Sequence, residues 1–534
     1  MQEKIPPFSM PMFHEWVPKG IRPWIYLLQA FCFQFGGGVY LGAMNDMIGE
    51  YQWMREDVQF MMYCTLAGMA IWFPVLFRMK FRFTNKTLLR AAMLGVAVTN
   101  LLTAYVSWLP LLLLCCFIEG ACKIQGTFEC MSNVQLWMTP TRDFRVFFPV
   151  LHLFIMGAQQ INGWGAAWCE FFGDWRLTHW VVCGLMLCLL LFQHICLRHF
   201  RIFPKTPLWG IDWLGMAQWV ALVMQLAALL NYGDWLDWYN SPTTWILTGT
   251  TCVTLATILR RMQMLPHAFI SRKVFKFKHV VPILVLIALC EMLLGTEYML
   301  EEMFCEETLH YTDYMGAWRY WPALLGCWAG CGFAYWWMKM HNFTYIRLAV
   351  VGLLSLLAYL VQMYFLISPD IAREMFFWPV VCRGFAATVL GIMFMISLHD
   401  SMDFLTFFQG LSLFNMLHMV LGSLFGVALY AKLFGWCVAD AFARYAPSVN
   451  SGSVARIAQG DGGVASFVEQ MVEVNLAVGI KTVYGVAIFG CILVLAGFLL
   501  YDAPMRRHTR TMQPWRALGR RFLRPLVRRK VSAV

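Results

Sequence analysis

Long apolar runs separated by short polar breaks fill the chain from Trp24 to Tyr501. The hydrocarbon core of a bilayer is roughly 30 Å thick, so a spanning helix needs about 20 mostly apolar residues. The candidate spans are 23–45, 57–77, 91–106, 109–130, 147–169, 177–197, 213–231, 243–259, 279–300, 320–339, 346–367, 376–397, 409–433 and 478–501. No large soluble domain fits between them. The pattern predicts an all-α polytopic membrane protein of about 14 transmembrane helices.

The connections between these spans alternate in charge. The basic set carries Arg78 to Arg90, Arg142 and Arg145, Arg198 to Lys205, Arg260 to Lys278, and Lys339 with Arg347. The acidic set carries Glu50 to Asp57, Asp174, Asp234 with Asp237, and Glu301 to Asp313. Basic loops stay in the cytoplasm, so the alternation predicts an inner-membrane protein with both termini cytoplasmic. The connection at His399, Asp400 and Asp403 departs from this pattern.

Composition agrees with a chain embedded in lipid, since 60% of the 534 residues are hydrophobic and only 13% are charged. The net charge of +11 lies in short loops rather than in a patch for nucleic acid. The 18 cysteines lack the paired spacings of a zinc site or a disulfide framework. We therefore predict no metal and no cofactor. The N-terminal segment lacks the features of a cleaved signal peptide and is expected to remain attached.

Five parts follow from the spans. They are a cytoplasmic segment 1–22, a six-helix half 23–197, two additional helices with a linker 198–278, a second six-helix half 279–501, and a basic cytoplasmic tail 502–534. Within the second half, 435–477 reads as a periplasmic loop, either for partner docking or as a tolerated insertion. The tail either lies on anionic lipid headgroups or is solvated.

Two pairs of short segments favour related halves. RMKFRFTN (78–85) follows the second span, and KMHNFTY (339–345) follows the tenth. CFIEGA (116–121) in the fourth span matches VCRGFA (381–386) in the twelfth. Internal repeats are common in transporters, although chance similarity between apolar helices remains an alternative.

GDWLDWYNS (233–241) resembles the stretch between the two additional helices of the fourteen-helix drug:proton antiporter branch of the major facilitator superfamily, the EmrB/QacA type. IDWLG (211–215), GDWRLTHW (173–180) and SLFNMLHMVLGSLFG (412–426) resemble further segments of that branch, in family order over nearly the whole chain. The resemblance implies a major facilitator fold of two six-helix halves with two additional central helices. It also implies proton-driven export, a periplasmic membrane-fusion adaptor and an outer-membrane channel.

Several residues depart from the family pattern. FGGGVYLGAMND (35–46) has glycines where the family has an Asp in its first helix. Cys116 stands at the place of the helix-four Arg, Glu119 at that of the Gln, and His418 at that of the Arg near the C-terminal end. The loop after the second span also lacks the usual Asp. The family's proton relay therefore does not transfer residue by residue.

Charges inside the predicted spans are the candidates for proton coupling, because each costs at least ~2.5 to 3.5 kcal/mol near the bilayer centre. Glu119, Glu291 and His418 fall near the midplane, with Lys123 and Arg383 within about two turns of it. Glu119 and Lys123 are four apart on one helical face, so they form either a switchable or a permanent ion pair. Glu291 is either a second proton site or the partner of Arg383. His418 is either a relay or a hydrogen-bonded core residue.

Gly37, Gly38 and Asn415 are the candidates for the substrate cavity. Glycines in FGGGVYLG (35–42) would permit close helix approach or bending, and packing alone also explains them. The abundant aromatic residues suit either a cavity for lipophilic compounds or belts at the two membrane interfaces.

These observations predict a secondary transporter for the proton-coupled efflux of small amphipathic compounds by alternating access. A first alternative is uptake or exchange of an anionic metabolite, with Lys123 and Arg383 as ligands of its carboxylate. A second is a membrane haem or quinone enzyme, raised by His152, His179, His194 and His418. Those histidines lack the spacing of facing haem ligands, and no phosphate-binding Walker loop indicates ATP coupling.

Overall fold

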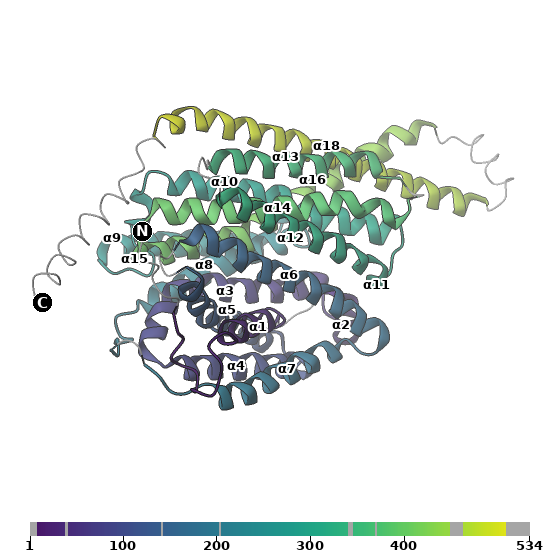
Figure 1. Cartoon of the computed structure of the whole chain (residues 1–534). Helices are drawn as coiled ribbons and strands as arrows, with labels where there is room; N and C mark the ends of the chain where they lie inside the picture. Colours follow the sequence, from purple (N-terminus) through teal and green to yellow (C-terminus); the bar gives the residue numbers. More distant parts are fainter. Residues whose placement is uncertain are drawn as a thin grey trace, which may run out of the picture.

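The apolar runs fold into helices that lie alongside one another (Figure 1). The computed structural model describes residues 8–37, 41–139, 143–201, 204–339, 345–368, 371–448 and 463–508. Within these ranges, 11 helices are long and apolar enough to cross a membrane. The prediction of an all-α polytopic membrane protein is confirmed. The helices at spans 23–45, 243–259 and 320–339 fall short of that criterion, so the total of 14 stays a prediction.

The first half comprises α1 (Arg22–Phe33), η1 (Leu41–Ala43), α2 (Met44–Tyr51), α3 (Arg55–Arg82), α4 (Asn85–Tyr105), α5 (Leu109–Met138), α6 (Phe144–Phe172) and α7 (Arg176–Cys196). Figure 1 shows these purple to blue helices as one group. Helix α5 packs against α1, α3 and α4.

The predicted span 23–45 is not one helix, because α1 ends at Phe33 and the next helical turn begins at Leu41. The break contains Gly36 and Gly37, where glycine's conformational entropy disfavours a helix. Gly38 lies outside the described residues. Non-helical backbone at membrane depth is tolerated only where protein or a cavity satisfies its polar groups, so the break must be buried or functional.

The second half begins with α10 (Val280–Leu294) and continues through two π-helical stretches, η4 (Glu297–Glu301) and η5 (Phe304–Thr308). It then runs through α11 (Asp313–Gly316), η6 (Ala317–Arg319), α12 (Tyr320–Lys339), α13 (Tyr345–Leu366), η7 (Arg373–Phe376), α14 (Phe377–Ser401), α15 (Phe404–Asn415), η8 (Met416–Leu421), α16 (Gly422–Tyr445), η9 (Ala446–Ser448) and α18 (Gly463–His508). The stretch η8 is also π-helical. π-Helical turns are rare in proteins, and those that occur are often found at functional sites.

Between the halves lie α8 (Trp213–Asn231), η2 (Trp238–Asn240), α9 (Pro242–Met264) and η3 (Val274–Lys276). Helix α8 packs on α3 of the first half and on α16 of the second, and α9 packs on α8. Asp212 caps α8 by accepting the Gly215 N–H at 2.9 Å, and it pairs with Arg261 of α9 at 2.6 Å. This helix pair therefore joins the two halves.

Close helix crossings recur in both halves at the segments matched by sequence. A Cβ on Gly120 of α5 would collide with the Thr65 carbonyl oxygen of α3, and one on Gly384 of α14 would lie 2.6 Å from the Ala323 carbonyl oxygen of α12. Gly68 and Gly326 make the reciprocal approaches to the backbone of α5 and α14. The CFIEGA and VCRGFA segments thus have the same packing role. Residues 340–344 of the other pair lie outside the described residues.

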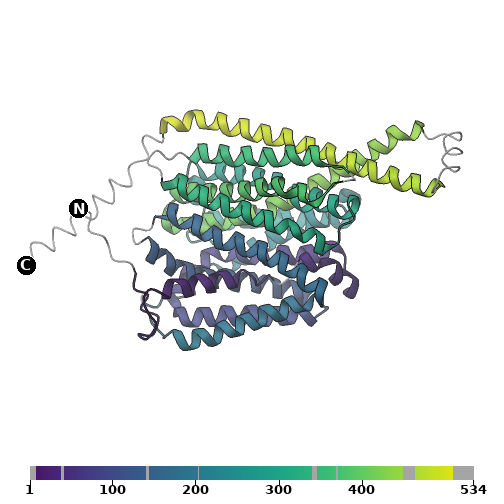
Figure 2. The same ribbon diagram turned by 45° about the vertical axis from the view of Figure 1, so that its right-hand side comes forward.

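The predicted loop 435–477 is helical on both sides. Helix α16 runs to Tyr445 and α18 begins at Gly463, and both extend beyond the other helices (Figure 1 and Figure 2). The residues 435–445 and 464–477 are free of proline and rich in Ala, Val and Phe, so nothing in them ends a helix. Residues 449–462 and the basic tail beyond His508 lie outside the described residues.

Side-chain contacts join the two halves at each end of the bundle. At the end that carries Arg78 to Arg82, here called the basic end, Arg145 of α6 pairs with Asp400 of α14 at 2.8 Å. At the opposite, acidic end, Arg55 of α3 pairs with Glu302 at 3.2 Å and with Glu306 at 3.3 Å. The acidic connection at Asp400, which departs from the charge alternation, therefore supplies an inter-half contact.

Candidate functional site

One cavity, of about 380 Å³, lies at the acidic end against Glu170 and Asp313. Two further cavities between the halves share lining residues. The larger, of about 490 Å³, reaches the basic end at Lys80 and Phe404, and the smaller, of about 310 Å³, reaches the acidic end at Asn45 and Asp313. The residues that line both include Gln34, Gln159, Glu297, Tyr298 and Arg383. The two cavities therefore meet in the middle of the bundle. Phe and Met side chains from both halves make up much of the larger cavity's wall, as is typical of sites for apolar ligands.

Glu291 and His418 form an ion pair when His418 is protonated, with 2.7 Å between Glu291 Oε1 and His418 Nδ1. Glu291 lies on α10 and His418 on the π-helical η8, and both line the larger cavity. Gly422 lies so close to Glu291 that a Cβ there would be 2.6 Å from the Glu291 Cβ. The two candidates therefore belong to one site, which spacing in the sequence did not indicate.

Arg383 does not pair with Glu291, contrary to one reading of the sequence. Its guanidinium contacts Glu297 at 2.9 Å and also pairs with Glu301. Glu301 is fully buried and pairs in addition with Arg319 at 3.2 Å. The π-helical turn η4 places both carboxylates toward α14, so the half-buried Glu297 joins the fully buried Glu301 in one ion cluster at the cavity wall.

Glu119 and Lys123 lie on the same face of α5, and each contacts a partner on another segment. Glu119 accepts a hydrogen bond from Asn100 Nδ2 at 2.6 Å. Lys123 Nζ donates to the Gln34 carbonyl oxygen at 3.1 Å, at the break after α1. Lys123 also lines the smaller cavity. The broken helix therefore receives a buried cation, which explains how its backbone is tolerated at this depth.

The three cavity candidates have different surroundings. Asn415 lines the larger cavity and donates to the Leu411 carbonyl oxygen at 2.8 Å. Gly37 is half-buried in the break after α1. The adjacent Gly36 is so near Glu119 that a Cβ would lie 3.3 Å from its Oε1. No role can be given to Gly38, which lies outside the described residues.

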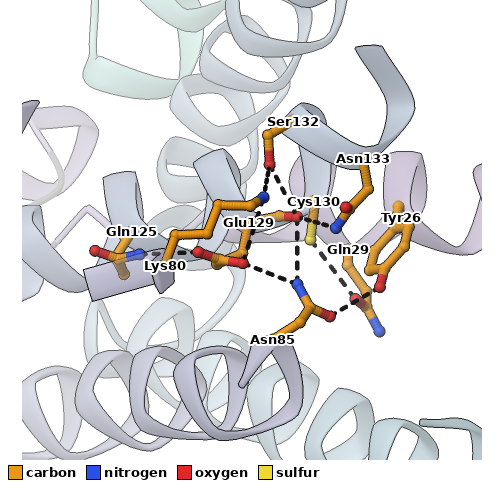
Figure 3. A network of polar contacts seen from close by, with 9 residues as sticks. All are labelled: Tyr26, Gln29, Lys80, Asn85, Gln125, Glu129, Cys130, Ser132 and Asn133. Carbon is orange, nitrogen blue, oxygen red and sulfur yellow. Dashed lines mark hydrogen bonds and ion pairs between the residues drawn. The ribbon is translucent and has the colours of Figure 1, made fainter. Parts of the chain in front are cut away.

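A buried carboxylate on α5 was missed from the sequence. Glu129 accepts hydrogen bonds from Asn85 Nδ2 at 2.9 Å and from Gln125 Nε2 at 3.3 Å, and Lys80 Nζ lies 3.7 Å away (Figure 3). The predicted span ended at 130, whereas α5 continues to Met138, so Glu129 is interior instead of terminal. A charged residue inside a predicted span is the sequence feature that marks such a site. Because the span was predicted to end at residue 130, Glu129 was assigned to the helix end.

Two of the four histidines lie near each other, on either side of Gly391. His152 and His418 line the larger cavity, whereas His179 lies 3.1 Å from Asn100 Oδ1 and His194 contacts Arg90. In the part of the chain that the structure describes, no group of three or more His, Cys, Asp or Glu side chains is arranged to hold a metal ion.

Comparison with known proteins shows similarity at the level of structure. No protein-family model and no curated protein matches the sequence. The human organic anion transporter MFSD10 (TETRAN) has a TM-score of 0.53 at 11% identity, over 90% of this chain and 100% of that chain. The nucleoside transporter NupG has a TM-score of 0.52 at 12% identity, over 90% and 98%. An auto-inhibited POT family peptide transporter has a TM-score of 0.50 at 12% identity, over 87% and 96%. The chain therefore has the fold of the major facilitator transporters.

Proposed function

We propose that the chain is a secondary transporter that exchanges small amphipathic compounds for protons across the inner membrane by alternating access. The observation that carries this proposal is the cavity of about 490 Å³ between the halves, in which the Glu291 and His418 pair faces Phe and Met side chains. Apolar walls with few polar groups suit an amphipathic ligand. The direction, efflux, comes from the sequence resemblance to drug:proton antiporters.

The Glu291 and His418 pair supplies a physical basis for coupling. While the two are in contact, each charge is compensated in a site that excludes most water. When a bound compound or a helix movement separates them, a buried imidazolium favours release of its proton and a buried carboxylate favours uptake of one. One proton crosses the membrane in this event when the imidazolium releases it toward one end of the bundle and the carboxylate takes one up from the other end. Substrate binding and proton movement are then linked through one pair.

Alternating access requires the contacts at the two ends to open in turn. The Arg145 and Asp400 pair closes the basic end, and the Arg55 pairs with Glu302 and Glu306 close the acidic end. Exposed ion pairs are worth only about 0 to 1 kcal/mol each, so they break readily as the halves rock. We retain the cytoplasmic placement of both termini as part of this proposal.

Substrate-dependent proton flux in inverted membrane vesicles tests the proposal. A pre-formed pH gradient is challenged with cationic, neutral and anionic amphiphiles, in wild type, Glu119→Gln, Glu291→Gln and the exposed control Glu307→Gln. We expect proton release with wild type and the control, and its loss in Glu291→Gln. No response of wild type to any compound would exclude proton-coupled transport of such compounds.

A second candidate is transport of an anionic metabolite. Lys123 lines the smaller cavity, and its Nζ donates to the Gln34 carbonyl oxygen at 3.1 Å. MFSD10 is named as an organic anion transporter. Uptake of a small dicarboxylate that is abolished by Lys123→Gln, without any response to amphiphiles, would favour this candidate.

The adaptor and outer-membrane channel implied by the resemblance remain proposals as well. The paired helix ends of α16 and α18 extend from the acidic end, where such an adaptor would meet the protein (Figure 2). Co-purification with a periplasmic adaptor, lost on removal of residues 446–462, is the expected result. Unchanged co-purification would exclude this surface.

A further inference from the structure

The basic end of the larger cavity contains a lysine with a loose ion pair. Lys80, near the end of α3, lines this cavity, and its side chain is 14% exposed, whereas that of Glu129 is 1% exposed. The Lys80 Nζ lies 3.7 Å from Glu129 Oε2, beyond hydrogen-bond distance, and donates to Ser132 Oγ. The ammonium group therefore stands between the cavity and a fully buried carboxylate (Figure 3).

Glu129 accepts hydrogen bonds from two side chains other than Lys80. Asn85 Nδ2 donates to its Oε2 at 2.9 Å, and Gln125 Nε2 donates to its Oε1 at 3.3 Å. Asn85 is fixed by the Tyr26 hydroxyl at 2.8 Å (Figure 3). Each carboxylate oxygen thus retains a hydrogen-bond donor when Lys80 turns toward a ligand. The loss of the counter-ion of Glu129 is a cost that the contacts of the ligand must outweigh. Arg383 differs, because it is held by two carboxylates at once.

Apolar surface lies directly beside this ammonium group. Lys80 Nζ is 5.3 Å from the centre of the Phe128 ring. Phe128 packs edge-on against Phe77 at 5.0 Å between ring centres, and Phe77 packs against Phe408 of the second half at 4.4 Å. All of these residues line the larger cavity. A cation next to an aromatic wall matches a ligand with an anionic group on an apolar body.

We propose that Lys80 binds the anionic group of an amphipathic substrate, a carboxylate, sulfonate or phosphate ester, while the apolar part packs on Phe77, Phe128 and Phe408. Glu129 is the resting counter-ion that the substrate replaces. The inference rests on the proposed transport function and specifies the charge of its substrates. It also joins the two halves in one site, because Phe408 lies on α15 and Lys80 on α3.

Binding to the purified full chain in phosphatidylcholine nanodiscs tests this, with calorimetry of 2-naphthalenesulfonate and 2-naphthylmethylammonium. These probes share one ring system and differ in charge. We expect Lys80→Gln to weaken sulfonate binding tenfold or more, as loss of a charge-assisted hydrogen bond would, with ammonium binding retained as the check on folding. Glu129→Gln removes the competing carboxylate and should tighten sulfonate binding. The exposed control Lys273→Gln should leave both unchanged.

Lys80→Gln should weaken sulfonate binding and Glu129→Gln should strengthen it, whereas a purely structural ion pair would give the same direction of change in both variants. Unchanged sulfonate binding in Lys80→Gln, or weakened binding in both Lys80→Gln and Glu129→Gln, would overturn the inference. Nanodiscs that also contain phosphatidylglycerol distinguish the source of the anion. If phosphatidylglycerol weakens sulfonate binding to wild type but not to Lys80→Gln, the natural ligand of Lys80 is a lipid phosphate. If phosphatidylglycerol has no effect on sulfonate binding, the ligand is a soluble amphiphile. The binding assay does not depend on transport. If the protein binds the sulfonate but shows no proton flux, that result contradicts the transport proposal and leaves the proposed role of Lys80 in place.

Discussion

Arg383 is the residue on which the charge balance of the second half depends. Its guanidinium pairs with Glu297 and Glu301, and Glu301 also binds Arg319 and accepts the Tyr359 hydroxyl at 3.0 Å. Two acids and two arginines make this cluster neutral as a unit. Removal of one partner from a buried ion pair strands a charge, which costs roughly 3 to 5 kcal/mol. The cluster therefore holds η4 and α14 together only while it is complete.

Arg383→Met should lower the thermal stability of the purified protein strongly, because the buried Glu301 and the half-buried Glu297 lose their shared cation. The triple variant Arg383→Met, Glu297→Gln, Glu301→Gln should recover part of the loss, since it removes the stranded charges as well. Arg373→Met, which breaks the exposed pair with Glu374 at 3.1 Å, is the matched control and should have little effect. The unfolding midpoint from tryptophan fluorescence measures all three. A midpoint of Arg383→Met equal to wild type would contradict the account.

Residue partners were the least predictable feature of the site. The depth of Glu119, Glu291, Arg383 and His418 followed from hydrophobic periodicity, and all of them are buried or face a cavity. Their partners lie on helices far away in sequence, such as His418 for Glu291. Spacing along one helix favoured an ion pair of Glu119 with Lys123, but could not show that the broken helix after α1 provides an acceptor for Lys123.

At the scale of elements, glycines set the distance between α3 and α5 and between α12 and α14. Gly120 and Gly384 approach the backbone of the facing helix at equivalent places in the two halves. Without strong hydrophobic driving force in lipid, such close packing is a main source of helix association. The adjacent Glu119 and Arg383 thus stand at corresponding positions, with an acid in one half and a base in the other.

The same substitution should have opposite effects at packed and open glycines. Gly120→Ala and Gly384→Ala place a methyl group against a facing carbonyl oxygen and should destabilise the protein. Gly184→Ala on α7 meets nothing within 4 Å and should be neutral or stabilising by up to about 1 kcal/mol, from helix propensity. Thermal unfolding in one detergent gives the comparison. Equal effects at Gly120 and Gly184 would show that the close crossing is not as described.

Asp212 fastens the two additional helices. Burial opposes its charge, but hydrogen bonds from Arg261 and from the Gly215 and Phe269 N–H groups outweigh burial and hold the pKa of Asp212 below its usual value. Its stabilisation is therefore complete at neutral pH and is lost only as the pH falls through that lowered pKa. Asp212→Asn should lower the unfolding midpoint by the same amount at pH 6 and pH 8. A deficit that disappears at either pH would contradict this.

Element positions were largely predictable, and element ends were not. Each predicted span other than 23–45, which is broken after Phe33, coincides with helix in the described residues, because long apolar periodicity is a strong signal. The ends moved where charges are buried: α5 passes Glu129, and the helix after α10 continues through Glu301. A charge satisfied by tertiary partners does not end a helix, which local sequence cannot reveal.

At the scale of the whole molecule, the structure holds the two halves together at both ends around one pair of cavities. Arg145 with Asp400 and Arg55 with Glu302 lie at opposite ends. Weakening the ion pair at one end of the bundle should favour the state in which that end is open over the state in which the opposite end is open.

Labelling of a cavity cysteine measures this balance. In a Ser132→Cys background, corrected for the labelling of native cysteines, Arg145→Gln should raise the rate of reaction with a charged maleimide, because Ser132 lines the basic end of the larger cavity. Arg55→Gln should lower the rate by favouring the opposite opening. Changes of the same sign in both variants would mean that these contacts do not control access.

The general architecture was predictable from the sequence, since the apolar spans indicated an all-α polytopic membrane protein and the family-like segments implied the major facilitator fold. The cavities were not, because they arise from the meeting of helices from the two halves. Phe77 and Phe408 are unremarkable apolar residues in the sequence and become one aromatic wall only after folding.

The most direct test of the account is proton coupling in liposomes that contain the purified protein. Exchange of a transported amphiphile across the membrane without a pH gradient, and its accumulation driven by a pH gradient, are measured for wild type, Glu291→Gln and the control Glu307→Gln. The account predicts that Glu291→Gln keeps exchange and loses gradient-driven accumulation, because the glutamine beside His418 cannot bind and release a proton. Accumulation equal to wild type in Glu291→Gln would contradict the central claim that this pair couples protons to transport.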